Sequence, residues 1–500
     1  MAERLRRLGS LTLVIAWAAL FLLMPITSLP LLSRLAGGAE VAPAALIPLG
    51  WLVLFWFIPY LLKKGAIPRE SIPFIFFISV AIIASAAAFF LYTPPFKNAD
   101  IPREEIRAIF TLLIGVAFYL VAASWFSKFP SRLNFFLKWI NVSGFIVILW
   151  AMIQAFYIFL FQGHYPAILQ MFQHLVSTRD LFPTRVTSFA FEPSWLAHMM
   201  NLIYLPFWLG ATISGTSAHR FHLWKISLEN ILLLLGALVV FLASRVGTLA
   251  LLVVLAFLGL YANVSLARRV YQWSLTRFAH FSTLLKKGIR ILLPLIILLV
   301  FISIYVLGAV GLVYGLSHVD KRLARFFQPL SLVQWTQLIE NPYAFFNYLA
   351  FAERYVYWVG GWNIFNIHPI LGVGLGNAGL FFQRELPSYS WNLPEVMDVY
   401  YRSSALPNIK SLWVRLLAET GILGFSSFIA WLYVVFRLGW FVRLSKNPLF
   451  RTIGWSGLFV LLAFIIEGFS KDTFALPYLW VSLGIVSAVG ALMRTSTEKP

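Results

Sequence analysis

The stretch that decides the fold is residues 291–313, ILLPLIILLVFISIYVLGAVGLV, which contain no charged side chain. A helix rises about 1.5 Å per residue, so about 20 apolar residues cross a hydrocarbon core of about 30 Å. The stretch therefore predicts a helix that spans a membrane rather than one buried in a soluble domain.

Similar apolar runs recur on both sides of this stretch, and together they predict about twelve membrane-crossing segments. The predicted segments are 10–32, 43–62, 72–92, 107–126, 139–161, 187–213, 226–243, 246–265, 291–313, 410–436, 452–467 and 474–493. Hydrophobic residues make up 60% of the 500-residue chain and charged residues 12%, whereas a soluble domain is about half apolar and about a quarter charged. The expected fold class is all-α: a polytopic transmembrane helical bundle with a long outer loop that contains interfacial helices.

The basic residues give the predicted helices an orientation. With the N-terminus in the cytoplasm, more than half of the 39 Lys and Arg residues lie in cytoplasmic segments, and most of the 19 Asp and Glu residues lie on the outer side. Lys and Arg near helix ends remain cytoplasmic in membrane proteins. We therefore expect a multi-pass protein of the bacterial inner (plasma) membrane, with both termini cytoplasmic. The net charge of +20 then meets anionic lipids, and no nucleic-acid partner is expected.

The first apolar run follows Arg4, Arg6 and Arg7, in the manner of a signal peptide. It is long for a signal peptide and has no clear small-residue cleavage site, so we expect a retained first helix. The predicted organisation has a nine-helix transmembrane part (1–313), a large extracytoplasmic loop (314–409) and three C-terminal helices (410–500).

A loop as long as 314–409 usually has a function. Phe351, Tyr355, Trp358 and Trp362 recur in it at helical spacing, which is typical of a helix lying at the membrane interface. The stretch from Lys321 to Ile339 mixes basic and aromatic residues in a similar way and is predicted to be amphipathic too.

Several kinds of chemistry are excluded or unexpected. The chain has no cysteine, which excludes disulfides and thiol catalysis. Its eight histidines form no ligand-spaced cluster, so we expect neither a metal site nor a cofactor. Residues Gly374 to Gly379 fit the pattern G-x-G-x-x-G, but they follow His368 in the outer loop without a predicted strand before them. We interpret these glycines as turn formers rather than a dinucleotide site.

Ionisable residues inside predicted spanning segments are costly, and they often mark functional sites. Glu192 falls near the start of the segment 187–213 and is followed by Pro193. One interpretation is a Glu192–Arg185 ion pair that pins a helix kinked by the proline. The other is a carboxylate that lines an active-site cavity.

The segment 410–436 holds a second group of charges. Arg415 and Glu419 are four residues apart, share one helix face and are predicted to form a supporting ion pair. Lys410, at the mouth of this helix, either extends to the interface or binds phosphate or sugar. Gly421 and Gly424 are predicted to let neighbouring helices pack closely.

Two more arginines are candidates for anion binding, because a guanidinium offers forked donors to phosphate oxygens. Arg245 follows Ser244 at the outer start of the eighth helix, and Arg354 lies beside the aromatic stripe of the outer loop. The alternative for each is a side chain that only reaches the membrane surface.

In their order, these motifs resemble the O-antigen ligase and polymerase superfamily, bacterial integral-membrane glycosyltransferases with a long outer loop before the last helices. The motifs that carry the resemblance are Ser244-Arg245-Val246-Gly247, Arg354 with Trp358 ahead of His368-Pro369-Ile370-Leu371-Gly372-Val373-Gly374, and Ala418-Glu419-Thr420-Gly421-Ile422-Leu423-Gly424. Phe191-Glu192-Pro193-Ser194 is similar to a segment of the polysaccharide-polymerase members.

The resemblance implies a metal-independent, inverting transfer of a glycan from polyprenyl diphosphate to an acceptor hydroxyl at the outer face. The partners implied are the lipid-linked donor, the glycan acceptor and the bilayer, whereas participation of a chain-length regulator is left open. Fixed cations must meet the charge that grows on the leaving diphosphate. Arg245, Arg354 and Arg185 are the expected donor-binding residues.

The chain departs from ligase-type members at Lys410, which stands where they carry a histidine. A protonated lysine is a poor base, so we expect Lys410 to bind phosphate or sugar and Glu192 to be the base. The predicted catalytic residues are thus Glu192, Arg354 and Lys410. The missing histidine favours an O-antigen or exopolysaccharide polymerase over a ligase-type transferase. A lipid-linked oligosaccharide flippase is an alternative of a different class, although the chain lacks the internal repeat common in transporters.

Overall fold

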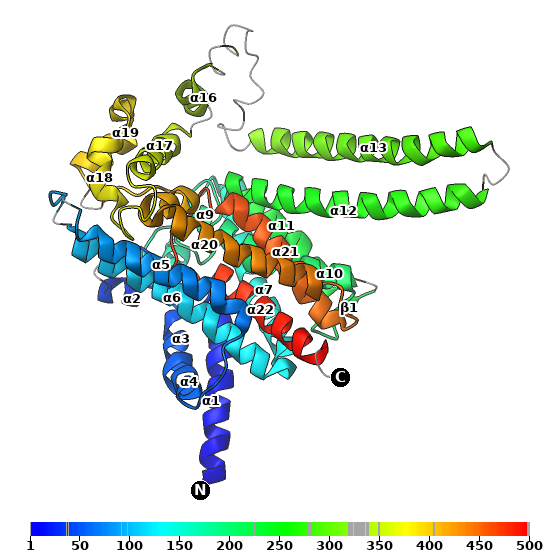
Figure 1. Ribbon diagram of the computed structural model, residues 1–500, viewed down its shortest axis with the longest axis horizontal. Helices are drawn as coiled ribbons and strands as arrows, with labels where there is room; N and C mark the ends of the chain where they lie inside the picture. Colours follow the sequence, from blue (N-terminus) through cyan, green and yellow to red (C-terminus); the bar gives the residue numbers. More distant parts are fainter. Residues whose placement is uncertain are drawn as a thin grey trace. The chain divides into compact units, whose positions relative to one another are not determined.

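The computed structural model describes residues 2–497 apart from 37, 39, 92, 98, 225, 278–281, 319–323, 325–335, 337–339, 349–350 and 404–405. Helices dominate the described part of the chain (Figure 1). Its strands, β1 (His222–Leu223) and β2 (Ile226–Ser227), pair as one short antiparallel hairpin. The predicted all-helical fold class is therefore confirmed.

The helices before residue 249 connect mostly through short turns. They are α1 (Ala2–Leu23), α2 (Pro30–Leu35), α3 (Leu46–Leu52), the π-helix η1 (Val53–Phe57), α4 (Ile58–Leu62), the 3-10 helix η2 (Arg69–Ser71), α5 (Ile72–Ala88), α6 (Ile101–Lys128), the 3-10 helix η3 (Pro130–Arg132), α7 (Leu133–Phe161), α8 (Ala167–Val176), α9 (Pro193–Met199), the π-helix η4 (Met200–Tyr204), α10 (Leu205–Ser214), α11 (Leu228–Ala243) and the start of α12 (Arg245–Arg277).

Long and short helices alternate in the remainder. They are α13 (Thr283–Ser317), α16 (Pro342–Tyr348), α17 (Ala352–Ile367), α18 (Ala378–Glu385), the 3-10 helix η6 (Ser388–Asn392), α19 (Pro394–Tyr401), α20 (Leu412–Val442), α21 (Pro448–Glu467) and α22 (Pro477–Thr497).

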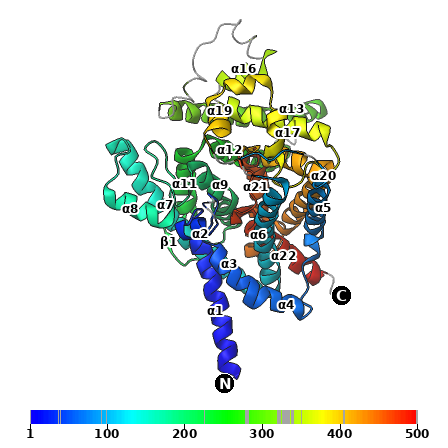
Figure 2. The same cartoon turned by 90° about the vertical axis from the view of Figure 1, so that its left-hand side faces the viewer.

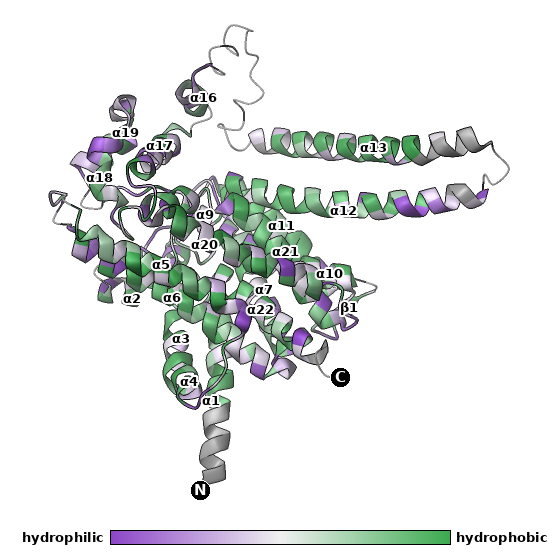
Figure 3. Ribbon diagram, in the orientation of Figure 1, coloured by the Kyte–Doolittle hydropathy of each residue, from purple (hydrophilic) through white to green (hydrophobic). Residues whose placement is uncertain are grey.

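Nine helices within the described residues are long and apolar enough to cross a membrane, which indicates a multi-pass membrane protein. Hydrophobic residues cover much of their visible surface (Figure 3). The predicted count of about twelve is not confirmed. Three predicted segments correspond to shorter apolar helices, Leu11–Leu23, Leu46–Leu62 and Leu228–Ala243. A helix as short as α11, with 16 residues, extends only about 24 Å.

The chain forms two compact units, which we describe separately. One unit comprises Met1–Thr248 and Val356–Pro500, and the other comprises Leu249–Tyr355. In the second unit the Tyr305 hydroxyl donates to the Leu252 carbonyl at 2.6 Å and joins α13 to α12. These units reflect packing, and the division of the chain predicted from membrane topology stays a prediction.

The core of the first unit lies where α5, α6, α20 and α22 meet. In it α6 packs along α22 and α5 along α20 (Figure 1). The Trp431 ring of α20 lies 4.5 Å from Phe74, 5.3 Å from Tyr119 and 5.7 Å from Trp480, centroid to centroid. All four rings are fully buried. Aromatic pairs of this kind add stabilisation beyond the burial of their area.

Helix α20 is broken near its start. Gly421 has φ 61° and ψ −167°, a backbone conformation that only glycine adopts without strain. Residues 369–374 lie against the break. They hydrogen-bond the backbone N–H and carbonyl groups of α20 that have no helical partner there. The hydrogen bonds are Val373 N to Ala418 O, Gly374 N to Glu419 O, Ile422 N to Pro369 O and Leu423 N to Ile370 O. Irregular backbone within a membrane protein requires such partners.

The glycine-rich loop that meets this break makes tight turns. Gly372, Gly374 and Gly376 have φ of 68°, 82° and 82°, and a Cβ on Gly374 would lie 2.6 Å from a Glu105 carboxylate oxygen. The interpretation of Gly374 and Gly376 as turn formers agrees with this geometry, whereas Gly379 lies on α18. Gly421 does permit a close approach, but to the adjoining loop rather than to the predicted neighbouring helix: it forms the break, and a Cβ there would lie 2.2 Å from the Ile370 carbonyl oxygen.

The placement of Glu192 inside a helix is also wrong. Helix α9 begins at Pro193, and Glu192 precedes it with φ −136° and ψ 154°. Proline at the first position of a helix removes only an N–H that has no helical partner there. Pro193 therefore starts α9 and does not kink it, and the irregular turn of this span is instead η4.

The predicted interfacial segments of the long loop are described in part. Tyr355, Trp358 and Trp362 lie on α17, directly after Phe351. The Trp358 ring lies 5.6 Å from the Phe469 ring, so this part of the aromatic stripe packs against protein. The predicted amphipathic stretch from Lys321 to Ile339 lies almost entirely outside the described residues.

Candidate functional site

A carboxylate lies between two cations where α9 begins and α21 ends. Glu192 Oε1 accepts from Arg179 Nη1 at 2.9 Å, and Glu192 Oε2 accepts from the Ser194 hydroxyl at 3.1 Å. The same hydroxyl accepts from Lys471 Nζ at 2.7 Å. Lys471 is only 8% exposed, whereas the Glu192 and Arg179 side chains are 36% and 43% exposed. We call Arg179, Glu192, Ser194 and Lys471 the Glu192 cluster. Its lysine is shielded from solvent, whereas its arginine and its carboxylate are partly exposed to solvent.

The segment between α8 and α9 supplies Arg179 and Glu192. Extended backbone at Glu192 lets its carbonyl accept from Trp195 and Leu196 at the start of α9. The Arg179 guanidinium lies 4.8 Å from the Phe182 ring centroid and 5.0 Å from that of Phe191. Cation–π contacts of this kind hold an arginine in one orientation without neutralising its charge.

Lys471 lies in the connection between α21 and α22. Its N–H donates to the Glu467 carbonyl at 3.0 Å, and its carbonyl accepts from the Leu412 N–H, also at 3.0 Å. Its ammonium lies 5.3 Å from the Trp195 ring centroid. The lysine is thus fixed by the end of α21, the start of α20 and the first turn of α9.

The pKa of the Glu192 carboxyl reflects opposing effects. Burial raises this pKa, but the positive charges of Lys471 and Arg179 and the Ser194 hydrogen bond lower it more, so the net shift is downward. Hydrogen bonds and nearby cations favour the ionised carboxylate. Glu192 is therefore a carboxylate at neutral pH and can accept hydrogen bonds, but its affinity for a proton is weakened.

The ion pair predicted on α20 is present. Arg415 Nε lies 2.8 Å from Glu419 Oε2, and the two side chains are 15% and 5% exposed. Arg415 also donates to the carbonyl of Asp472, the residue after Lys471. The Gly376 backbone hydrogen-bonds the Glu419 carboxylate. The pair thereby joins α20, the glycine-rich loop and the Lys471 connection.

Lys410 lies just before α20, with a left-handed φ of 56°. Its ammonium forms an ion pair with Glu395 of α19 and lies 5.0 Å from the Tyr357 ring centroid. The next residue, Ser411, donates its hydroxyl to the Gly468 carbonyl at 3.3 Å. Lys410 is therefore held at the end of the bundle where the Lys471 connection lies, with an acidic partner that the sequence analysis did not consider.

The remaining predicted arginines differ in their surroundings. Arg185 is half-buried in the segment that also carries Arg179. Arg245 starts α12, and two residues later the Gly247 carbonyl accepts from Asn201 Nδ2 at 2.9 Å. Arg354 belongs to the second compact unit, where its guanidinium lies 5.6 Å from the Phe351 ring centroid.

Two buried titratable side chains form a pair between α9 and α21. His198 Nδ1 of α9 lies 3.5 Å from Glu467 Oε2 of α21, with the two side chains 7% and 2% exposed. Asn201 Nδ2 donates to Glu467 Oε1 at 2.8 Å as well as to α12. Since Lys471 is bound to the Glu467 carbonyl, this pair adjoins the Glu192 cluster.

Sequence reasoning missed four residues of this region: Arg179, Lys471, His198 and Glu467. Lys471 lies in the short connection between two predicted spanning segments, and Glu467 is the last residue of the first of them, so charge at that connection was a usable signal. Arg179 gave none, because it lies thirteen positions before Glu192 along irregular chain. Among the described residues, no group of three or more His, Asp or Glu side chains could hold a metal ion.

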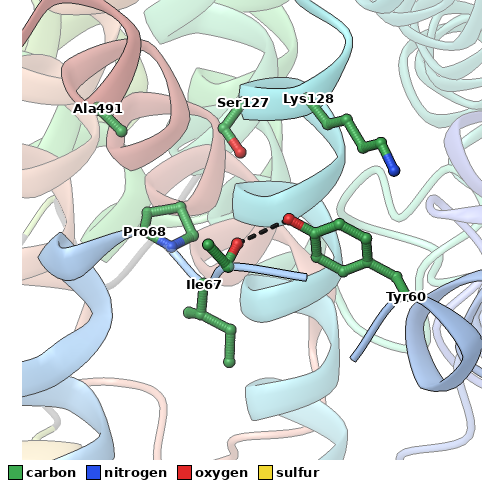
Figure 4. Close-up of a pocket in the computed structure, with 7 residues that line it drawn as sticks. Tyr60, Ile67, Pro68, Ser127, Lys128 and Ala491 are labelled. Atoms are coloured by element: carbon green, nitrogen blue, oxygen red, sulfur yellow. Dashed lines mark hydrogen bonds between the residues drawn. The ribbon is translucent and has the colours of Figure 1, made fainter. Parts of the chain in front are cut away.

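A pocket of about 330 Å³ lies elsewhere, at the C-terminal ends of α6 and α22 (Figure 4). Lys128 Nζ lies 4.7 Å from the Tyr60 ring centroid beside it, and the Tyr60 hydroxyl donates to the Ala66 carbonyl at 2.8 Å. The residues that line it are Tyr60, Ala66, Ile67, Pro68, Ser127, Lys128 and Ala491. This lining contains no carboxylate or histidine, so we do not take it as the catalytic site.

No protein-family model matches the chain, and no curated protein matches it in sequence.

Proposed function

We propose that the protein is a membrane glycosyltransferase that polymerises polyprenyl-diphosphate-linked oligosaccharide units into surface polysaccharide. It acts at the outer face of the bacterial inner membrane, with its termini in the cytoplasm. The observation that supports this proposal is the Glu192 carboxylate beside Arg179 and Lys471, at one end of a membrane-embedded bundle. Such a reaction needs a base and cations at one place, close to lipid.

The proposed reaction is a single displacement. The acceptor hydroxyl oxygen attacks the anomeric carbon of the donor, the bond from that carbon to the diphosphate oxygen breaks, and the configuration inverts. The hydroxyl proton passes to Glu192 as general base. The diphosphate leaves with the electron pair, and fixed cations meet its negative charge, without metal or nucleotide sugar.

The cations nearest to the base are Arg179 and Lys471. Arg185, Arg245 and Arg354 remain proposed donor-binding residues, and Lys410 a proposed phosphate or sugar ligand. Cations that bind the diphosphate are partly neutralised by it. Because the same cations lower the pKa of Glu192, donor binding would raise that pKa and strengthen the base when it is needed.

A second candidate function, transport of the lipid-linked glycan, is favoured by the buried His198–Glu467 pair. Ionisable pairs within spanning helices often form proton pathways in transporters, and the two side chains here are 7% and 2% exposed. A flippase would move the donor across the bilayer and leave its glycosyl–phosphate bond intact.

The test is glycan chain length in liposomes that contain the protein and the polyprenyl-diphosphate repeat unit. We expect a product ladder from the wild type and none from Arg354→Ala or Glu192→Gln, with donor binding retained in Glu192→Gln. Glu40→Gln is the matched control, because Glu40 is an exposed carboxylate. Turnover retained in Glu192→Gln would exclude Glu192 as the base.

The same experiment separates the alternatives. A single product on a different acceptor would identify a ligase-type transferase. Donor that crosses the bilayer and is never consumed would identify a flippase, and the polymerase proposal would then be wrong.

A further inference from the structure

Helix α8 exposes a continuous apolar stripe. Ile168, Met171, Phe172 and Leu175 are 73%, 70%, 41% and 71% exposed. These positions follow the spacing i, i+3, i+4 and i+7, so they lie on one face of the helix. Four large apolar side chains side by side form a patch that water covers only at a cost.

The side of α8 that contacts the protein carries two glutamines, and Phe172, at the border of the stripe, lies 4.8 Å from the Trp150 ring, centroid to centroid. Gln173 is 1% exposed, and its Oε1 accepts from the Trp150 indole of α7 at 3.1 Å. Gln170 Oε1 accepts from the Leu181 N–H at 3.3 Å. In a soluble protein an amphipathic helix turns its apolar face to the core. Helix α8 is turned the other way, which is the orientation expected where the surroundings are lipid.

The stripe continues an apolar surface of a spanning helix. The last two turns of α7 expose Phe156, Phe159 and Leu160 by 52%, 54% and 66%, as lipid-facing side chains do. Helix α8 begins six residues after α7 ends, and it lies beside α7 at the edge of its unit (Figure 2).

We propose that α8 lies in the plane of the membrane interface, with its stripe among the acyl chains of the leaflet on the Glu192 side. Arg179 follows the last residue of α8 by three positions, and its side chain is 43% exposed. An interfacial helix with its apolar face buried about 5–10 Å would hold this arginine at the depth of lipid phosphates. The Glu192 cluster then meets an anionic head group that remains attached to its lipid and enters sideways from the bilayer.

The docking of α8 on lipid does not depend on the proposed function. The identity of the lipid whose head group meets the Glu192 cluster does rest on the proposed function: if the protein is a glycosyltransferase, that lipid is the polyprenyl-diphosphate donor. The experiment therefore measures membrane depth first and donor use second.

The chain has no cysteine, so a single cysteine placed anywhere takes a nitroxide label alone. Labels at Ile168→Cys, Met171→Cys and Leu175→Cys are compared in liposomes with a lipid reference, Leu160→Cys, and a water reference, Asp398→Cys. The Asp398 side chain is 61% exposed and its partner Arg402 is 84% exposed, so its loss costs little.

Collisions of each label with oxygen, which concentrates in acyl chains, are compared with those of a water-soluble nickel complex. We expect the three α8 labels to match the Leu160 reference, with oxygen collisions dominant. Labels at Ile168, Met171 and Leu175 that match the Asp398 reference would overturn the proposal. This readout needs no activity, so it decides the docking of α8 even if the protein proves not to be a transferase.

The second measurement is donor use by Leu175→Asp. Moving one apolar contact from lipid to water should raise the KM for the lipid-linked donor about tenfold and leave kcat unchanged. Leu62→Asp is the control, because Leu62 is 80% exposed at the end of α4. An unchanged KM in Leu175→Asp would overturn the role of α8 in donor entry.

Discussion

Two ion pairs with almost the same length have very different surroundings. Arg415 and Glu419 lie 2.8 Å apart with 15% and 5% of their side chains exposed. Arg179 and Glu192 lie 2.9 Å apart with 43% and 36% exposed. In the first pair both side chains also hydrogen-bond backbone groups of the protein. In the second, the carboxylate is fixed on one side and accessible on the other.

The difference separates a pair that holds the fold from one that is available for chemistry. Arg415 also bonds the Asp472 carbonyl, and Glu419 also bonds the Gly376 backbone, so each completes the hydrogen bonding of irregular chain. The Glu192 cluster is built from a loop and an interhelical connection, and its Arg179 and Glu192 side chains are partly exposed.

Removal of charge from the buried pair should have the largest effect. Glu419→Gln removes the carboxylate bonded to the buried Arg415 guanidinium and leaves Asp472 as its remaining acidic neighbour; removal of one partner of a buried pair typically costs about 3–5 kcal/mol. We expect the free energy of unfolding in mixed micelles to fall by this amount. Exposed Arg179→Gln should cost far less, since exposed pairs contribute little.

A double variant, Arg415→Met with Glu419→Leu, sharpens this result. Replacement of a buried pair by apolar residues is often tolerated, so the double variant should be more stable than Glu419→Gln. Equal loss in both would mean that the bonds to Asp472 and Gly376, rather than the charge of Glu419, stabilise this region.

The break in α20 should be the next most sensitive point. Gly421→Ala places a side chain at φ 61°, which costs about 1–3 kcal/mol for the backbone alone, and crowds the Ile370 carbonyl. Thermal unfolding in detergent should show the loss. Gly50→Ala is the matched control, because a Cβ on Gly50 has no atom within 4 Å; an equal effect at both positions would refute the role of the break.

The smallest expected effect is a change of pKa in the Glu192 cluster. Because the pKa of Glu192 is lowered in the folded protein, its ionisation stabilises the fold above its ordinary pKa, and this contribution disappears as pH falls through the folded value. Lys471→Met removes a cation, so Glu192 should protonate at higher pH than in the wild type. Infrared titration of the carboxyl band, with Glu192→Gln to assign it, measures the shift.

The control for that titration is Lys446→Met, at an exposed lysine of the α20–α21 connection. It should leave the Glu192 band unchanged. A titration that is the same in Lys471→Met and in the wild type would mean that Lys471 does not act on the carboxylate.

The features that the sequence predicted correctly depend on residues close together in the chain. The Arg415–Glu419 pair followed from a spacing of four on one helix, and the spanning segments followed from apolar runs. The start of α9 was missed although Pro193 signals it, because the apolar run on its N-terminal side looked like helix. Proline at the first helical position was the stronger sign.

Long-range contacts explain what the sequence did not predict. The Lys471 ammonium and the Ser194 hydroxyl are 277 positions apart, and no local pattern links them. The break at Gly421 depends on residues 369–374, which look like an ordinary turn until their hydrogen bonds to α20 are known. Lys410 was considered without Glu395, because α19 was not predicted.

The hydrogen bonds between residues 369–374 and the break in α20 also fix an order of assembly. Residues 369–374 leave the ribosome before α20 does, and chains fold from the N-terminus as they are made. The second half of α20 can therefore settle only against a loop that has already been made. A delay in the placement of that loop would leave an unfinished helix in the membrane, with peptide groups that lipid cannot solvate and that quality-control proteases could recognise.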